Sequence, residues 1–488
     1  MEPNLPPQVA VVGGGVAGLL AALLEAKKGH RVVLIERAAE LGGLLRSHVL
    51  PTGHTVDYGT HFMADTSIDE LDELLRGVLQ PDDLEEFGPI KAGTFAFGRL
   101  NTACASLDIR GLGRELEARI VAETLCGSDG PTDSPNLAHR IDRVFGPTAR
   151  TEVFDPILRK LTGVGCEELA PDALKLFSLA RLVALEPAAA QRLKATPHGD
   201  ARFAFHSNAE GRNPSTAYYP RQGGIGRWTR ALADAVVRAG VELRLATSVD
   251  TLVREAPGRV VLSLSDGTEV ECTRLFWSVP LGMLLKALGE TPAAPPNFRS
   301  SLIEHFVFDQ PFATDAHYIH TYGPDVRPFR VTLYPNFTTT SRPGYPCTVE
   351  TLLDANSAAS DRDNLRTTHL ELVRMGLVRA DARVLYAEGH LERAVFPVLT
   401  PAYRRLIETQ RIEVDCLLPE CTCIGKATGR DFFMVDVLRD TWARCQAPLP
   451  NLVANPQSLT ASRWQASPEE PGSTTPAALM AERARRSA

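Results

Sequence analysis

The chain has 488 residues, more than one hydrophobic core usually supports, so two or more domains are expected. The formal net charge is −7, from 52 basic and 59 acidic residues, and no basic tract is present, which argues against a nucleic-acid partner. Hydrophobic residues make up 44% and charged residues 23%, as in an ordinary globular protein.

The N-terminal part predicts a strand, a helix and a second strand. Residues 9–12 form a short apolar, β-branched run, which is typical of a buried parallel strand. Residues 16–28 have helical composition, and residues 32–35 form another buried strand. The preceding segment, MEPNLPPQ, has neither the basic nor the apolar region of a secretory signal, so no leader is expected.

The turn between the first strand and the helix has the spacing G-x-G-x-x-G of a dinucleotide-binding site. Gly13 allows the tight turn, Gly15 lets a pyrophosphate approach the backbone, and Gly18 lets helix and strand pack closely. The N–H groups at the start of the helix, from Val16 and Ala17, are expected to bind the phosphates.

The end of the second strand predicts the ribose contact. Glu36 lies 18 residues after Gly18, where an acidic side chain accepts hydrogen bonds from a ribose diol. Arg37 follows and is also expected at the cofactor, but the carboxylate before it would repel a 2′-phosphate, so no NADP preference is expected. A second glycine pair ends at Gly43 and is followed by Arg46, for which a phosphate contact is favoured over a solvated side chain.

The rest of the chain alternates between these elements and other material. Residues 101–214 are mostly helical in composition, with 111–125 and 172–195 as the clearest amphipathic stretches. Residues 291–385 alternate as antiparallel strands do, and 421–445 predict a strand, a glycine turn and a helix. The inner face of that helix is expected to contain Met434, Val437, Leu438, Thr441, Trp442 and Cys445.

Nucleotide-binding elements recur in three separate parts, so a discontinuous domain is expected. The predicted division is residues 1–100, 215–290 and 386–454 for the nucleotide domain, 101–214 and 291–385 for the substrate domain, and 455–488 for a mobile tail. The nine cysteines do not suggest a disulfide framework. Zinc ligation by Cys416, Cys421, Cys423 and Cys445 is an alternative, but free thiols in a cytoplasmic protein are favoured, without metal. No apolar run reaches the roughly 20 residues of a membrane helix.

Taken together, these segments resemble the flavoprotein superfamily of amine oxidases, protoporphyrinogen oxidases, phytoene desaturases and UDP-galactopyranose mutases. The resemblance covers most of the chain to about residue 445. It is carried by Gly13, Gly15, Gly18, Glu36, Gly42, Gly43 and Arg46, by the D-x-G-x-H segment of Asp57, Gly59 and His61, by YYPRQGGIGRW and by the segment from Gly429 to Asp436. It implies an α/β fold with a discontinuous Rossmann-like FAD-binding domain, a helical insertion and an antiparallel-sheet substrate domain.

The resemblance also implies non-covalent FAD. Val249 is placed where the family uses backbone groups against adenine, and Gly429, Arg430 and the Met434 amide are placed near the pyrimidine edge of the flavin. A positive charge or a helix N-terminus there would stabilise the reduced flavin. Arg430 as a helix-entry residue in a surface ion pair is the alternative.

The function implied is removal of a hydride from a C–H or C–N bond of a small molecule by an FAD-dependent, amine oxidase-like oxidoreductase. His61, Tyr219, Arg330 and Tyr334 are the expected lining of the substrate cavity, with His61 also placed beside the flavin. Core packing is the alternative for His61 and for both tyrosines. A non-redox isomerase of the UDP-galactopyranose mutase type and an FAD-binding protein without catalysis remain open, as does the oligomeric state.

Overall fold

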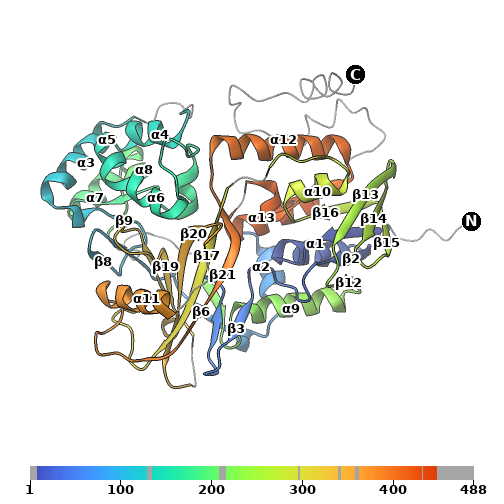
Figure 1. Ribbon diagram of the computed structural model, residues 1–488, viewed down its shortest axis with the longest axis horizontal. Helices are drawn as coiled ribbons and strands as arrows, with labels where there is room; N and C mark the ends of the chain where they lie inside the picture. The colour runs from blue at the N-terminus through green and yellow to red at the C-terminus, as the bar shows by residue number, and fades with distance from the viewer. Residues whose placement is uncertain are drawn as a thin grey trace, which may run out of the picture.

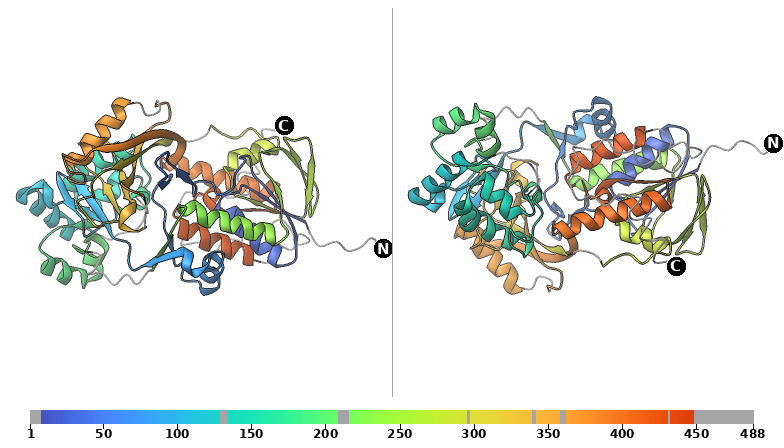
Figure 2. Two further views of the ribbon diagram at one scale, coloured as in Figure 1. Left: turned by 90° about the horizontal axis from the view of Figure 1, so that it is seen from below. Right: turned by 90° about the horizontal axis from the view of Figure 1, so that it is seen from above.

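The computed structural model describes residues 8–128, 134–207, 216–294, 297–338, 342–357, 362–430 and 432–447. The predicted tail at 455–488 and the end of the predicted nucleotide domain at 448–454 lie outside these ranges. The Rossmann part lies on one side of the molecule, and a large sheet with the helical insertion lies on the other (Figure 1, Figure 2).

A five-stranded parallel sheet forms the centre of the Rossmann part. Its order is β12 (Glu242–Arg244), β2 (Arg31–Ile35), β1 (Gln8–Val12), β16 (Arg274–Trp277) and β22 (Cys421–Cys423). These strands come from three distant parts of the chain and pair in parallel register. The expected discontinuous Rossmann-like fold is therefore confirmed.

Both faces of this sheet are covered, as a parallel sheet requires. Val9 and Val11 of β1 face a core shared with α1 (Val16–Lys27), α9 (Ile225–Arg238) and α13 (Met434–Gln446). Alternate residues of β1 face the opposite core, which includes α10 (Leu281–Ala287), α12 (Pro401–Leu417) and the antiparallel strands β13 (Val249–Ala256), β14 (Arg259–Leu264) and β15 (Glu269–Cys272). In α13 the predicted inner face is confirmed, since Val437, Leu438, Thr441 and Cys445 are buried and Met434 and Trp442 pack beside them.

The second sheet has seven strands. Its order is β21 (Val384–Pro397), β17 (Phe298–Phe308), β20 (Tyr345–Asp354), β19 (Arg330–Leu333), β18 (Tyr318–Thr321), β7 (Ala92–Ala96) and β8 (Arg99–Asn101). All neighbours are antiparallel except β18 and β7, which are parallel. The expected boundaries at residues 100 and 386 fall inside β8 and β21, so this sheet takes residues from both sides of each boundary.

The sheet has one apolar and one polar face. Ile319, Val331 and Val349 lie in register on the apolar face, in a core that includes Leu372 of α11 (Arg362–Arg374). The opposite face carries polar residues and is described with the site.

The prediction that the insertion is mostly helical is confirmed, but its helices begin and end at other residues than the amphipathic stretches indicate. Its helices are α3 (Arg114–Cys126), α4 (Leu137–Val144), α5 (Pro147–Ala149), α6 (Asp155–Thr162), α7 (Pro187–Lys194) and α8 (Pro197–Arg202). The amphipathic stretch predicted at 172–195 is not one helix. It forms a 3-10 turn that ends at Ser178 with φ 58°, the short strand β10 (Leu182–Val183), and α7, which begins at Pro187. Proline at a first helical position starts a helix but cannot continue one.

The remaining elements are β3 (Ser47–Val49), β4 (Thr55–Asp57), β5 (Met63–Ala64), α2 (Asp69–Arg76), β6 (Leu84–Phe87), β9 (Leu107–Asp108) and β11 (Ala217–Pro220). Across the part of the chain that the structure describes, no helix has the length and apolar character needed to cross a bilayer.

Candidate functional site

The turn between β1 and α1 has room for a ligand at one glycine and none at its neighbours. A Cβ on Gly18 would lie 1.8 Å from the carbonyl oxygen of Gly13, and Gly13 itself has φ +103°. A Cβ on Gly15 would meet nothing within 4 Å. No side chain of the described residues caps α1, and its first turn has no acidic residue. Because helix N-terminal N–H groups lack intrahelical partners, this end of α1 suits an anionic group.

The second glycine pair packs directly against this turn. The N–H of Gly42 donates to the carbonyl of Gly14 at 2.8 Å, and a Cβ on Gly43 would lie 3.2 Å from the Cα of Gly15. Arg46 donates from Nε to the carbonyl of Gly43 at 2.8 Å, and its guanidinium lies 5.3 Å from the centroid of the Tyr58 ring. The two turns and Arg46 therefore form one continuous site.

Glu36 is bonded to the same turn. Its carboxylate accepts the N–H of Gly14 at 2.6 Å and the N–H of Ala38 at 2.8 Å. Arg37 is exposed, and Val249 is the first residue of β13, partly buried against the adjoining core. The carboxylate thus lies at the end of β2, as predicted, and it also holds the glycine turn.

From the second glycine pair the chain continues through β3 and β4 to a loop, residues 57–61, that lies on the polar face of the seven-stranded sheet. At its start, Asp57 accepts hydrogen bonds from Ser47 Oγ and Tyr219 Oη, both at 2.6 Å, and from the N–H of Ile225 at 3.1 Å. Burial raises the pKa of Asp57 to about 6, although these three donors oppose the shift. Further along, the hydroxyls of Thr60 and Thr332 are hydrogen-bonded.

Both predicted cavity tyrosines are bonded to Asp57 rather than open to a substrate. Tyr219 and Tyr334 are 2% and 1% exposed. Tyr334 Oη accepts the N–H of Asp57 at 2.7 Å and lies 2.9 Å from Thr348 Oγ1. The structure therefore corrects the prediction that these tyrosines line the cavity, because their hydroxyls connect the loop to the sheet.

The polar face of the sheet is organised by its register. His320, Arg330 and Glu350 are opposite one another on β18, β19 and β20, so their side chains share one face. Arg330 donates from Nε and Nη2 to the two carboxylate oxygens of Glu350, at 2.7 and 2.8 Å. A Cβ on Gly59 would lie 3.2 Å from Glu350 Oε2 and 3.3 Å from His61 Nε2. His61 and Arg330, both predicted from the sequence, are therefore brought together.

The two histidines here are neutral. Burial lowers the pKa of His61 to about 3, with the charges of Arg330 and Lys426 acting in the same direction. Burial and Arg330 likewise lower the pKa of His320 to about 3. Nδ1 of His320 is buried and has no hydrogen-bond partner among the described residues.

The C-terminal turn brings a lysine to this region. Lys426 lies in the 3-10 turn Gly425–Thr428, with its Nζ 4.2 Å from the centroid of the Phe432 ring. Burial first, and then Arg330, lower its pKa to about 8, although its side chain is exposed.

Gly429, Arg430 and Met434, the residues of this segment predicted from the sequence, have different neighbours from those of Lys426. Gly429 has φ +67°, and a Cβ there would lie 2.3 Å from Ile407 Cγ2. Arg430 is exposed, its N–H donates to Thr428 Oγ1 at 3.3 Å, and Met434 is the first residue of α13. Sequence reasoning missed Lys426, which directly follows Gly425 and lies four residues before Arg430. It also missed Glu350, which no local pattern distinguishes.

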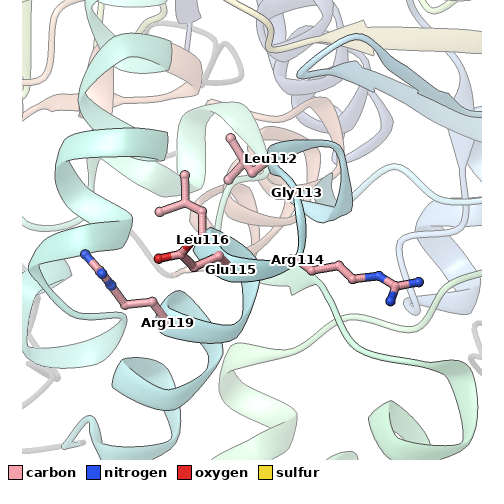
Figure 3. A pocket seen from close by; sticks show the side chains of 6 residues that line it. All are labelled: Leu112, Gly113, Arg114, Glu115, Leu116 and Arg119. Atoms are coloured by element: carbon pink, nitrogen blue, oxygen red, sulfur yellow. The ribbon is translucent and has the colours of Figure 1, made fainter.

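Two further features lie away from this site. A hollow of about 360 Å³ lies at the start of α3, lined by residues 112–116 and Arg119, and the side chains of Arg114 and Arg119 point apart (Figure 3). None of the nine cysteines is in a disulfide, and the described ranges contain no group of three or more His, Cys, Asp or Glu residues arranged for a metal ion.

Residues 11–77 match the family model of the NAD(P)-binding Rossmann-like domain. The chain is 27% identical over 346 residues to a phytoene dehydrogenase of Streptomyces griseus, in a match covering 64% of this chain and 63% of that protein's length. A crystal structure of reduced UDP-galactopyranose mutase superposes with a TM-score of 0.72 at 15% identity, covering 93% of this chain and 98% of the other. The chain shares the fold of UDP-galactopyranose mutase.

A putrescine oxidase structure with bound putrescine is also similar, with a TM-score of 0.57 at 15% identity over 91% of this chain and 99% of the other. The predicted resemblance to this group of proteins is therefore confirmed for the fold. The chain has a Rossmann-like nucleotide-binding domain joined to a seven-stranded sheet.

Proposed function

We propose that the protein is an oxidoreductase that binds FAD non-covalently and removes a hydride from a C–H or C–N bond of a small molecule. The observation that carries this proposal is the open, uncapped start of α1 at Gly15, in contact with the second glycine pair. A dinucleotide would satisfy the free N–H groups there and fill the space that Gly15 leaves.

The residues proposed to hold FAD follow from this site. Glu36 takes the ribose hydroxyls, the amides of the first turn of α1 take the pyrophosphate, and Arg46 adds a positive charge beside Gly43. The other proposed contacts are those of Gly13, Val16, Ala17, Gly18, Val249, His61, Gly429 and the Met434 amide. Arg430 is proposed beside the pyrimidine edge of the flavin, where its positive charge would stabilise the reduced cofactor. Lys426 is assigned to the substrate side, because its charge acts on His61 and interacts with that of Arg330.

When bound, FAD supplies the acceptor for a hydride. The loop at 57–61 leads from the cofactor residues to the polar sheet face, so we assign the substrate to that face. His61 and His320 are neutral there, so each ring has one N–H that can donate a hydrogen bond and one nitrogen that can accept one. Arg330, fixed by Glu350, orients groups on the same face.

The names of two similar proteins, a dehydrogenase and an oxidase, agree with hydride removal. The second candidate is a non-redox isomerase of the UDP-galactopyranose mutase type. It is favoured by the TM-score of 0.72, with 98% of that structure covered.

The proposal is tested on purified protein. It should be yellow, or become so with added FAD, and heat denaturation should release FAD. Colourless protein that cannot be reconstituted with FAD would contradict the proposal. Anaerobic mixing with candidate substrates then separates the two reactions, because an oxidoreductase bleaches the flavin when substrate arrives. An isomerase instead needs flavin reduced beforehand and returns it in the same redox state. FAD binding without either behaviour would indicate a binding protein.

A further inference from the structure

We propose that the polar sheet face selects a substrate with an anionic group, a carboxylate or a phosphate, and rejects a protonated amine. This inference rests on the proposed function and specifies the substrate class of the same site. It distinguishes the protein from an oxidase of cationic amines.

The charges on this face are the first argument. Arg330 is neutralised by Glu350, which accepts both of its hydrogen bonds within 2.8 Å and is 3% exposed. Lys426 adds a second cation, and its Nζ lies over the ring of Phe432, 4.2 Å from the centroid. Arg330 and Lys426, whose charges both act on His61, are both positive. Among the described residues no ion pair joins Lys426 to a carboxylate, whereas Arg330 is paired with Glu350, and Asp57 is bonded to Ser47, Tyr219 and the N–H of Ile225.

The protonation state of Lys426 is the second argument. With a pKa of about 8, the ammonium is charged at neutral pH, and its side chain still reaches solvent. An anion that binds beside this ammonium becomes its ion-pair partner. The attraction is stronger than in water, because charges interact more strongly where protein has replaced water. A protonated amine would instead place a second cation beside it.

His320 supplies a second polar contact. The residue is 8% exposed, and its buried Nδ1 has no partner among the described residues. A buried polar atom without a partner is costly, so a ligand oxygen that bonds it stabilises the complex. The ring is held between Tyr318, edge-on at 5.1 Å, and Tyr322, stacked at 5.5 Å, which fixes its orientation.

Aromatic rings indicate the shape of the rest of the substrate. Phe432 packs against Phe396 at 5.3 Å between centroids, and Phe433 beside it is 45% exposed. Together with Lys426 these rings suit an anion attached to an apolar or flat body.

The test compares four probes of one shape on the FAD-loaded protein: benzoate, phenyl phosphate, benzyl alcohol and benzylamine. Binding is measured by calorimetry and by the change in flavin absorbance. Benzoate or phenyl phosphate should bind at least tenfold more tightly than benzyl alcohol, and benzylamine should not bind. The tighter of the two anions identifies carboxylate or phosphate as the preferred group. Affinity for that anion should fall as the pH rises through about 8.

Variants assign the effect to one residue. Lys426→Met should weaken anion binding at least tenfold with FAD content unchanged, and Lys426→Arg should retain it. Lys91→Met is the matched control, because Lys91, directly before β7, is an exposed lysine that is ion-paired with the exposed Asp315. Unchanged anion binding in Lys426→Met, tighter binding of benzylamine, or no binding of any probe would overturn the inference.

Loss of FAD in Lys426→Met would also overturn it, since the lysine would then belong to the cofactor site. If the wild-type protein takes up no FAD, the proposed function fails by itself. The same calorimetric titrations on the cofactor-free protein then decide between anion and amine.

Discussion

Separating Arg330 from Glu350 should destabilise the protein far more than removing both charges. Arg330 and Glu350 have 19% and 3% exposed side chains and are joined by two hydrogen bonds. Breaking such a buried pair by removing one partner typically costs about 3–5 kcal/mol, because the other charge stays buried without compensation. Replacing both by uncharged groups of similar size is often close to neutral.

The expected result follows directly. Arg330→Met and Glu350→Gln should each lower the melting temperature by about 3–5 °C, at roughly 1 °C per kcal/mol for a chain of 488 residues. The double variant should recover most of this loss. Scanning calorimetry on the FAD-free proteins measures it, and Lys91→Met, which breaks an exposed pair worth roughly 0–1 kcal/mol, is the control.

The reasoning is refuted if the single variants lose less than about 1 kcal/mol each and the double variant loses their sum, because the two residues would then be independent. The comparison of the single and double variants also shows how Arg330 should be tested for function. A single Arg330→Ala variant leaves Glu350 buried and unpaired, so turnover should be compared between wild type and the double variant.

Three further predictions concern the cofactor residue and the loop. Glu36→Ala should weaken FAD binding at least tenfold, since hydrogen bonds to a charged acceptor are worth roughly 1.5–3 kcal/mol each; a fluorescence titration with an unchanged Kd would contradict the ribose assignment. The pKa of Asp57 is raised to about 6 in the folded state, so the folded protein binds this proton more tightly than the unfolded chain does. The free energy of unfolding should therefore fall by about 3 kcal/mol as the pH rises from below 3.8 to above 6. Melting curves should show this slope in wild type and not in Asp57→Asn. Tyr219→Phe and Tyr334→Phe should each cost about 1–2 kcal/mol of stability, by urea unfolding, and leave probe binding within twofold; a selective loss of binding would return these tyrosines to the cavity.

The Rossmann part was predictable because its signals are local. The strand, the glycine turn, the helix and the acidic residue at the strand end all lie within residues 8–36. Each has a backbone requirement that only certain residues meet, as Gly18 shows by its contact with the carbonyl of Gly13.

The substrate side was less predictable because its contacts are between distant residues. Glu350 and Arg330 are 20 residues apart, and only the register of β19 and β20 brings them together. Tyr334 and Asp57 are 277 residues apart, so a sequence motif around either one cannot show that the hydroxyl is already used. The predicted boundary after residue 100 falls inside β8 for the same reason, because the sequence of a strand does not show which strand it pairs with.

The most direct test of the account is FAD binding by Gly15→Ala. Gly15 has φ −74° and ψ 178°, which alanine adopts freely, and the added Cβ meets nothing within 4 Å. The variant should therefore fold with the circular dichroism and melting temperature of the wild-type protein without FAD, while binding FAD at least tenfold more weakly. Gly18→Ala, whose Cβ would lie 1.8 Å from a backbone oxygen, should lose stability as well. Wild-type FAD affinity in Gly15→Ala would contradict the claim that the pyrophosphate binds at this turn.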